Sequence, residues 1–184
     1  MEHLAIGQAD VVGQSAGGNT ALQVAIRHPE LVRKLVPISA KYRDDGEYPE
    51  VLAGLQQMTP EGLAGSPFED PYLRNAPNRE DFPVLVEKLK ELFGKEYAWP
   101  DEDMQSIAAP TLLIYGDSDS IRPEHAVELF RLLGGGVPGD FGPLPSSQLA
   151  ILPGITHGSI VSERTDRLLA MVEAFLAAPR PEAA

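Results

Sequence analysis

The chain has 184 residues, long enough for a hydrophobic core, and its 43% hydrophobic and 23% charged residues are typical of a globular protein rather than a disordered one. It contains no cysteine, which excludes disulfides, thiolate metal sites and a cysteine nucleophile. Its net charge of −12 disfavours nucleic acids and anionic membrane surfaces as partners.

The first residues carry no targeting signal that we can identify. Met1–Gly7 lacks both the basic region and the continuous apolar core of a secretory signal. No later run approaches the ~18 apolar residues of a membrane span. We therefore expect a cytoplasmic protein without a membrane segment.

A strand, a tight turn and a helix are predicted next. Ala9–Val12 is a short, largely apolar run that leads directly into a glycine-rich turn. Asn19–Arg27 then has apolar residues at helical spacing, and Pro29 ends that helix. The opening therefore predicts a strand–turn–helix unit.

Three more apolar runs alternate with helical patterns. The runs are Leu35–Ile38, Thr111–Tyr115 and Gln148–Leu152, and the helices are predicted at Glu124–Leu133 and Glu163–Leu176. Continuous apolar runs suit strands that are covered on both faces, as in a parallel sheet. We predict an α/β fold with about four parallel strands and flanking helices.

Residues 42–109 interrupt this alternation. Pro49–Met58 and Arg79–Phe93 have helical patterns, and proline and glycine separate them. An insertion at the carboxyl ends of parallel strands lies where such sheets bind ligands. We therefore expect a helical lid at 42–109, inserted into a core formed by residues 1–41 and 110–184.

Two segments have unusual compositions. Between Asp44 and Met104 there are fifteen acidic and five basic residues, a balance of −10, which is typical of a solvated surface and gives no reason to infer a metal site. Between Gly134 and Ser147, eight of fourteen residues are glycine or proline, which predicts a surface loop; gating of a site is the alternative. The tail Ala178–Ala184 is expected to fray.

The turn after the first strand carries the strongest motif. Gly13-Gln-Ser15-Ala-Gly17 matches the G-x-S-x-G nucleophile elbow, with a predicted strand before it and a helix after it. We expect glycine to be needed at 13 and 17, where side chains would collide with the strand and helix. Ser15 is then the candidate nucleophile. The N–H of Ala16, at the helix N-terminus, is the candidate oxyanion donor.

With this elbow, the chain resembles the α/β-hydrolase superfamily over nearly its whole length, specifically the lid-bearing esterase and carbon–carbon bond hydrolase group. In that family the acid follows the next-to-last strand in a Gly-x-x-Asp pattern often followed by proline. Gly116-Asp-Ser-Asp119, with Pro123 after it, matches this pattern and implies Asp119 as the acid. Asp117 is the competing candidate, and its alternative role is to fix the turn by accepting backbone N–H groups.

The resemblance also implies the base. The family's histidine follows the last strand, as His157 does here, and the order Ser, Asp, His agrees. The other histidines are interpreted as structural or exposed: His3 in the N-terminal segment, His28 at a helix end and His125 within a predicted helix.

The implied reaction is acyl transfer through an acyl-enzyme on Ser15, with His157 as general base and Asp119 holding its tautomer. A serine nucleophile argues against the dehalogenase and epoxide hydrolase branches, which the resemblance associates with aspartate. A small carboxylic ester is the expected substrate, and thioester, lactone and carbon–carbon cleavage stay open.

Aromatic side chains between 68 and 99 either line an acyl pocket or form the lid core: Phe68, Tyr72, Phe82, Phe93, Tyr97 and Trp99.

No cofactor is expected. The glycine spacing around Ser15 differs from that of dinucleotide-binding loops, and no Walker lysine follows it. The substrate-binding residues cannot be assigned from the sequence, because pocket shape rather than fold sets them.

Full members of the family have further strands before the elbow, so we expect this chain to start inside the family pattern, with Ala16 as the one identifiable oxyanion donor. Its strand at Ala9–Val12 would then lie at a sheet edge and pair with a second copy, giving a homo-oligomer. The alternative function is a catalytically weak or inactive hydrolase fragment that acts as a self-associating module.

Overall fold

The computed structural model describes residues 1–140 and 142–179, so residues 180–184 of the predicted tail lie outside the described part. The chain divides into two compact units. One comprises Met1–Glu47 and Ala98–Ala184, and the other comprises Tyr48–Tyr97. The boundaries expected for the insertion, 42 and 109, lie outside the second unit on both sides.

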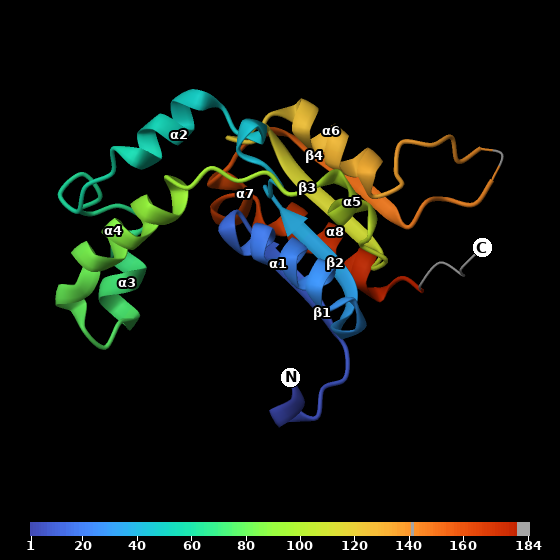
Figure 1. Ribbon diagram of the computed structural model, residues 1–184, viewed down its shortest axis with the longest axis horizontal. Coiled ribbons are helices and arrows are strands. Elements are labelled where there is room, and N and C mark those ends of the chain that lie inside the picture. Colours follow the sequence, from blue (N-terminus) through green and yellow to red (C-terminus); the bar gives the residue numbers. More distant parts are fainter. Residues whose placement is uncertain (141, 180–184) are drawn as a thin grey trace. The chain divides into compact units, whose positions relative to one another are not determined.

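A parallel sheet forms the centre of the first unit (Figure 1). Among the described residues it has four strands in the order β1 (Ala9–Gln14), β2 (Val32–Ile38), β3 (Thr111–Ser118) and β4 (Ser147–Thr156). Each neighbouring pair is parallel. The predicted α/β class with four parallel strands is confirmed.

Helices cover both faces of this sheet (Figure 1). On one face, α1 (Ala16–Arg27) and α6 (Pro123–Leu132) pack in a cluster that contains Leu35 of β2. On the other face, α8 (Thr165–Ala177) packs in a cluster that contains Val36. Successive strand residues point to opposite faces, which is why the strands are apolar at consecutive positions.

Several short helices complete the first unit. The 3-10 helices η1 (Glu2–Leu4), η2 (Pro29–Leu31) and η3 (Asp44–Gly46) and the short helix α5 (Asp101–Gln105) belong to the same unit. The predicted helix 163–176 begins two residues later than expected and is preceded by a separate turn, α7 (Ser159–Ser162). Neither α5 nor α7 was predicted, because four or five residues are too few to show a helical period.

The second unit is helical. It contains α2 (Pro49–Gln56), α3 (Glu69–Asn75), η4 (Arg79–Asp81) and α4 (Phe82–Phe93), and both α2 and α3 contact α4. The rings of Tyr72 and Phe82 lie 5.6 Å apart between centroids. The two predicted helices are confirmed and α3 is an addition. An acyl pocket lined by aromatic residues stays a prediction for this unit.

Trp99 lies outside the helical unit, contrary to its grouping with the lid aromatics. It packs against the core cluster around α1 and α6, and its backbone N–H donates to the Tyr42 carbonyl at 3.0 Å.

The glycine- and proline-rich segment has no helix or strand at residues 134–140 and 142–146, which confirms the predicted loop. Gating by that loop stays a prediction.

Strand β1 forms one edge of the described sheet, with β2 as its neighbour, and Val12 on it is 48% exposed. Self-association through this edge stays a prediction, and it requires a concentration-dependent dimer. Light scattering across micromolar concentrations should detect that dimer, and a monomer throughout the range would contradict it.

Within residues 1–140 and 142–179, no helix combines the length and apolar character needed to cross a membrane.

Candidate active site

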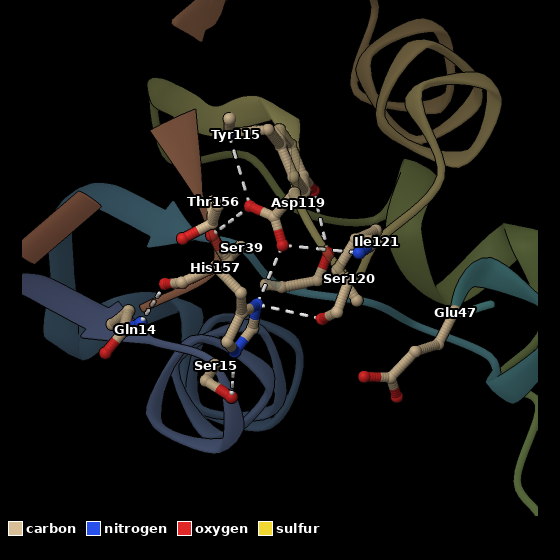
Figure 2. Close-up of polar contacts among 12 residues, drawn as sticks. Gln14, Ser15, Ser39, Glu47, Tyr115, Asp119, Ser120, Ile121, Thr156 and His157 are labelled. Atoms are coloured by element: carbon tan, nitrogen blue, oxygen red, sulfur yellow. Dashed lines mark hydrogen bonds and ion pairs between the residues drawn. The ribbon is translucent and has the colours of Figure 1, made fainter. Parts of the chain in front are cut away.

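The residues that directly follow the four strands gather at one edge of the sheet (Figure 2). Ser15 follows β1, Ser39 follows β2, Asp119 follows β3 and His157 follows β4. Because parallel strands end at the same edge, four polar side chains that are distant in sequence are brought together. Three of them are the residues predicted from the sequence.

Ser15 turns the chain from strand to helix within one residue. Its φ and ψ of 56° and −123° lie in a region that residues with a Cβ rarely adopt, so the elbow is strained. The Ser15 N–H donates to the Ile38 carbonyl at 2.8 Å, and its own carbonyl accepts the Asn19 N–H at 2.9 Å. These bonds hold the strained conformation in place.

Close packing requires glycine at two positions around the elbow, Gly13 and Gly18, and only Gly13 was predicted. A Cβ on Gly13 would lie 2.2 Å from the carbonyl oxygen of Gly17, so glycine is needed there as predicted. A Cβ on Gly17 itself meets no neighbouring atom within 4 Å, so the predicted collision at that position is wrong. The crowded residue is Gly18, whose Cβ would lie 2.9 Å from that of Ala40.

This contrast gives a matched pair of variants. Gly13→Ala should lower the free energy of unfolding by about 2 kcal/mol, because the elbow must open to relieve a clash between backbone atoms. Gly17→Ala should leave it unchanged or raise it by up to about 1 kcal/mol, since alanine is the better helix former. Urea unfolding measures both, and equal midpoints for the two variants would contradict this packing argument.

The three predicted residues form a continuous chain of hydrogen bonds (Figure 2). His157 Nε2 lies 2.9 Å from Ser15 Oγ, and His157 Nδ1 lies 2.7 Å from Asp119 Oδ1. A carboxylate only accepts hydrogen bonds, so Nδ1 carries the proton and Nε2 is left with a lone pair that faces the Ser15 hydroxyl.

The carboxylate of Asp119 is 6% exposed and fully engaged. Oδ2 accepts the Ser39 hydroxyl at 2.5 Å and the Gly116 N–H at 3.2 Å, and Oδ1 also accepts the Ile121 N–H at 3.2 Å. Burial is the largest influence on the Asp119 pKa and raises it. The hydrogen bonds from His157 and Ser39, the His157 charge and the Gly116 N–H together outweigh burial and hold the pKa below its usual value. The carboxylate is therefore ionised near neutral pH.

Asp117 has a different role. Its Oδ1 accepts the N–H groups of Gly154 at 2.8 Å and Ile155 at 3.3 Å, so it holds the end of β4. The Gly154 hydrogen bond is the main cause of its lowered pKa. Of the two candidate acids, Asp119 is the one that contacts His157, and Asp117 bonds backbone N–H groups as the alternative interpretation expected.

Two further side chains contact His157 and were not identified from the sequence. Gln14 Nε2 donates to the His157 carbonyl at 3.0 Å, which ties the elbow to the histidine loop across 143 positions of sequence. Ser120 Oγ lies 3.0 Å from His157 Nδ1. Gln14 directly precedes Ser15, and Ser120 directly follows Asp119. These sequence positions are the only feature of the sequence that could have indicated a role at the site.

The segment around η3 supports the acid loop. Glu47 forms an antiparallel bridge with Ile121, and the Arg122 N–H donates to the Gly46 carbonyl at 2.8 Å. A Cβ on Gly46 would lie 2.6 Å from the ring of His125, so the segment approaches α6 at van der Waals distance. This contact is possible only with glycine at 46.

The remaining histidines lie away from the triad contacts, as the sequence analysis expected. His3 is exposed, and His28 ends α1 and pairs with Glu30 at the surface. His125 is buried in α6, where its Nε2 accepts the Tyr42 N–H at 3.3 Å and its ring stacks on that tyrosine. In the described part of the chain, no group of three or more His, Asp or Glu side chains is placed to hold a metal ion.

Ala16 is the first residue of α1, so its N–H belongs to the helical turn whose N–H groups have no intrahelical partner. An N–H at that position adjoins the Ser15 hydroxyl and has the favourable end of the helix dipole behind it. The geometry therefore allows Ala16 to donate to negative charge that develops beside Ser15.

Comparison with known proteins supports the fold. The model of the alpha/beta hydrolase fold family matches residues 1–70. A 2-hydroxymuconate semialdehyde hydrolase from Pseudomonas putida is 26% identical over 96% of this chain, and a pimeloyl-[acyl-carrier protein] methyl ester esterase from Yersinia enterocolitica is 27% identical over 84% of it. The chain spans 65% and 64% of the length of these two relatives.

Solved structures share the architecture. The meta-cleavage product hydrolase CumD from Pseudomonas fluorescens matches 96% of this chain with 67% of its own, at a TM-score of 0.65 and 22% identity. The carboxylesterase CesB from Bacillus subtilis matches 96% of this chain with 62% of its own, at a TM-score of 0.65 and 20% identity. Together with the family model over residues 1–70, these similarities show that the chain has the α/β-hydrolase fold.

Proposed function

We propose that this chain carries the catalytic triad of a serine hydrolase that cleaves small carboxylic esters through an acyl-enzyme on Ser15. The observation that carries the proposal is the unbroken hydrogen-bonded chain from Ser15 through His157 to Asp119. Nucleophile, base and orienting acid in this geometry are what acyl transfer requires.

In the first step, Ser15 Oγ attacks the ester carbonyl carbon while His157 Nε2 takes the hydroxyl proton. The charge on the resulting imidazolium is stabilised by the Asp119 carboxylate across the 2.7 Å contact to Nδ1. The carbonyl oxygen becomes an oxyanion, which accepts a hydrogen bond from the Ala16 N–H. His157 then gives the proton to the leaving alcohol as the carbon–oxygen bond breaks.

In the second step, water attacks the acyl-enzyme. His157 Nε2 takes a proton from the water as its oxygen adds to the acyl carbon, and returns a proton to Ser15 Oγ as the carboxylic acid leaves. The enzyme is thereby restored, and the sum of the two steps is the hydrolysis of one ester bond by one water molecule.

The names of the relatives favour two kinds of substrate. One relative is named a methyl ester esterase and one solved neighbour a carboxylesterase, which supports ester cleavage. A semialdehyde hydrolase and a meta-cleavage product hydrolase favour carbon–carbon bond hydrolysis as the second candidate. The hydrogen-bonded side chains of Ser15, His157 and Asp119 would be available to either reaction, so a meta-cleavage product belongs beside the esters in any substrate comparison.

The test is hydrolysis of a short-chain chromogenic ester by the purified chain, run beside Ser15→Ala. We expect the rate to fall by up to about 10⁶-fold in the variant, because removal of a serine nucleophile costs on that order. Circular dichroism of both proteins controls for folding. Equal and negligible rates from two folded proteins would reject the proposal and favour the alternative of a weak or inactive, self-associating hydrolase fragment.

A further inference from the structure

Ser39 belongs to none of the sequence motifs, and its backbone conformation is unusual for serine. It follows β2 with a φ of 49°, in the left-handed region, and it is 1% exposed. Its N–H donates to the Ile114 carbonyl at 2.8 Å, which holds the turn against β3. A residue with a Cβ in this region carries conformational strain, and such strain persists only where the surroundings impose it.

The hydroxyl of Ser39 points at the acid of the triad (Figure 2). Ser39 Oγ donates to Asp119 Oδ2 at 2.5 Å, and the other donor to that oxygen is the Gly116 N–H at 3.2 Å. The second oxygen, Oδ1, faces His157 Nδ1. A short bond on one oxygen fixes the rotation of the carboxylate and therefore the direction in which the other oxygen accepts.

We propose that Ser39 is a positioning residue that orients the Asp119 carboxylate toward His157. The proposal rests on the triad chemistry proposed above, and it assigns a purpose to the strained turn after β2. With Ser39, the residue that directly follows each of the four strands contributes to one hydrogen-bonded system: Ser39 to Asp119, Asp119 to His157 and His157 to Ser15.

The test uses two variants of Ser39 and one matched control. Ser39→Ala deletes the hydroxyl and keeps the Cβ, whereas Ser39→Gly deletes it and also relieves the left-handed strain. Ser147→Ala is the control, because Ser147 is 3% exposed and its hydroxyl makes an equally buried bond, 2.6 Å to the Leu133 carbonyl at the other end of the sheet. All three lose one buried serine hydrogen bond, so Ser39→Ala and Ser147→Ala should lose comparable stability, and Ser39→Gly should lose less because its strain is relieved.

Two readouts separate positioning from a general structural role. Both Ser39 variants should lower kcat on the chromogenic ester by about 10- to 100-fold with little change in KM, because a misdirected carboxylate no longer holds the imidazole in line. The far-downfield proton NMR signal of His157 Nδ1–H, assigned by its absence from His157→Gln, should move upfield or broaden in both. Ser147→Ala should keep the kcat and the signal of the unmodified protein.

Three results would overturn the proposal. The first is an unchanged NMR signal and kcat in Ser39→Ala. The second is recovery of both in Ser39→Gly alone, which would assign the effect to backbone strain. The third is the same change in Ser147→Ala, which would assign it to lost stability. The NMR signal does not depend on turnover, so the carboxylate geometry is tested even if the ester assay shows that the proposed reaction does not occur.

Discussion

Asp119→Asn is expected to lower kcat on the ester substrate by about 10⁴-fold, whereas Asp117→Asn should lower it by less than about 10-fold. An asparagine amide at 119 can donate to His157 Nδ1, which would place the ring proton on Nε2. A protonated Nε2 cannot accept the Ser15 proton, so the base is lost while the packing is kept. Asp117 instead bonds the backbone of β4, and an asparagine carbonyl there still accepts the N–H of Gly154.

The two variants should be compared at saturating ester, with unfolding midpoints measured alongside. The pair is a direct contrast between two neighbouring candidates for the acid, since Asp117 lies near the end of β3 and Asp119 directly follows that strand. If Asp117→Asn lost the larger share of kcat, the assignment of Asp119 as the acid would be wrong. Equal losses with a common fall in stability would show damage to the turn instead.

The second large effect concerns stability and pH. Burial is the main reason that the pKa of His125 falls from 6.5 to about 4, and the nearby cations Arg43, Arg122 and Lys41 lower it while Asp45 raises it. The folded protein therefore keeps His125 neutral where the unfolded chain binds a proton. Stability is lost as the pH falls from about 6.5 to about 4, by about 3 kcal/mol in total.

The measurement is urea unfolding at pH 7 and at pH 4.5 for the unmodified chain and for His125→Gln. Glutamine has no proton to gain in this range and can accept the Tyr42 N–H that His125 Nε2 accepts at 3.3 Å. We expect the unmodified chain to lose about 2 kcal/mol more than the variant between the two pH values. Parallel losses would show that other groups cause the acid sensitivity.

Much of the core could be predicted because its signals are local. The apolar runs marked the four strands, and their order of appearance in the chain is also their order in the sheet. The carboxyl ends of β3 and β4 were missed because pairing continues through polar and glycine residues, such as Ser118 with Thr156. Hydrophobicity does not mark those positions, although they bring Asp119 and His157 to the same edge.

Ser15, Asp119 and His157, which the structure joins by hydrogen bonds, could be selected from the sequence because each follows a predicted strand in a recognisable motif. Ser39 follows a predicted strand too, but no motif names it, and its bond to Asp119 joins residues that are 80 positions apart. The error at Gly17 has a similar cause. Which of two adjacent helical glycines faces the neighbouring strand depends on the rotation of α1, and the G-x-S-x-G pattern carries no information about the contact of Gly18 with Ala40.

The central claim is that Ser15 is an activated nucleophile, and covalent labelling tests it most directly. The purified chain should be incubated with a fluorophosphonate probe, which reacts with activated serine hydroxyls, and the site of modification read by mass spectrometry. The account predicts one adduct on Ser15 that is absent in Ser15→Ala and forms much more slowly in His157→Gln. No adduct on the folded chain, or an adduct on another serine, would contradict it.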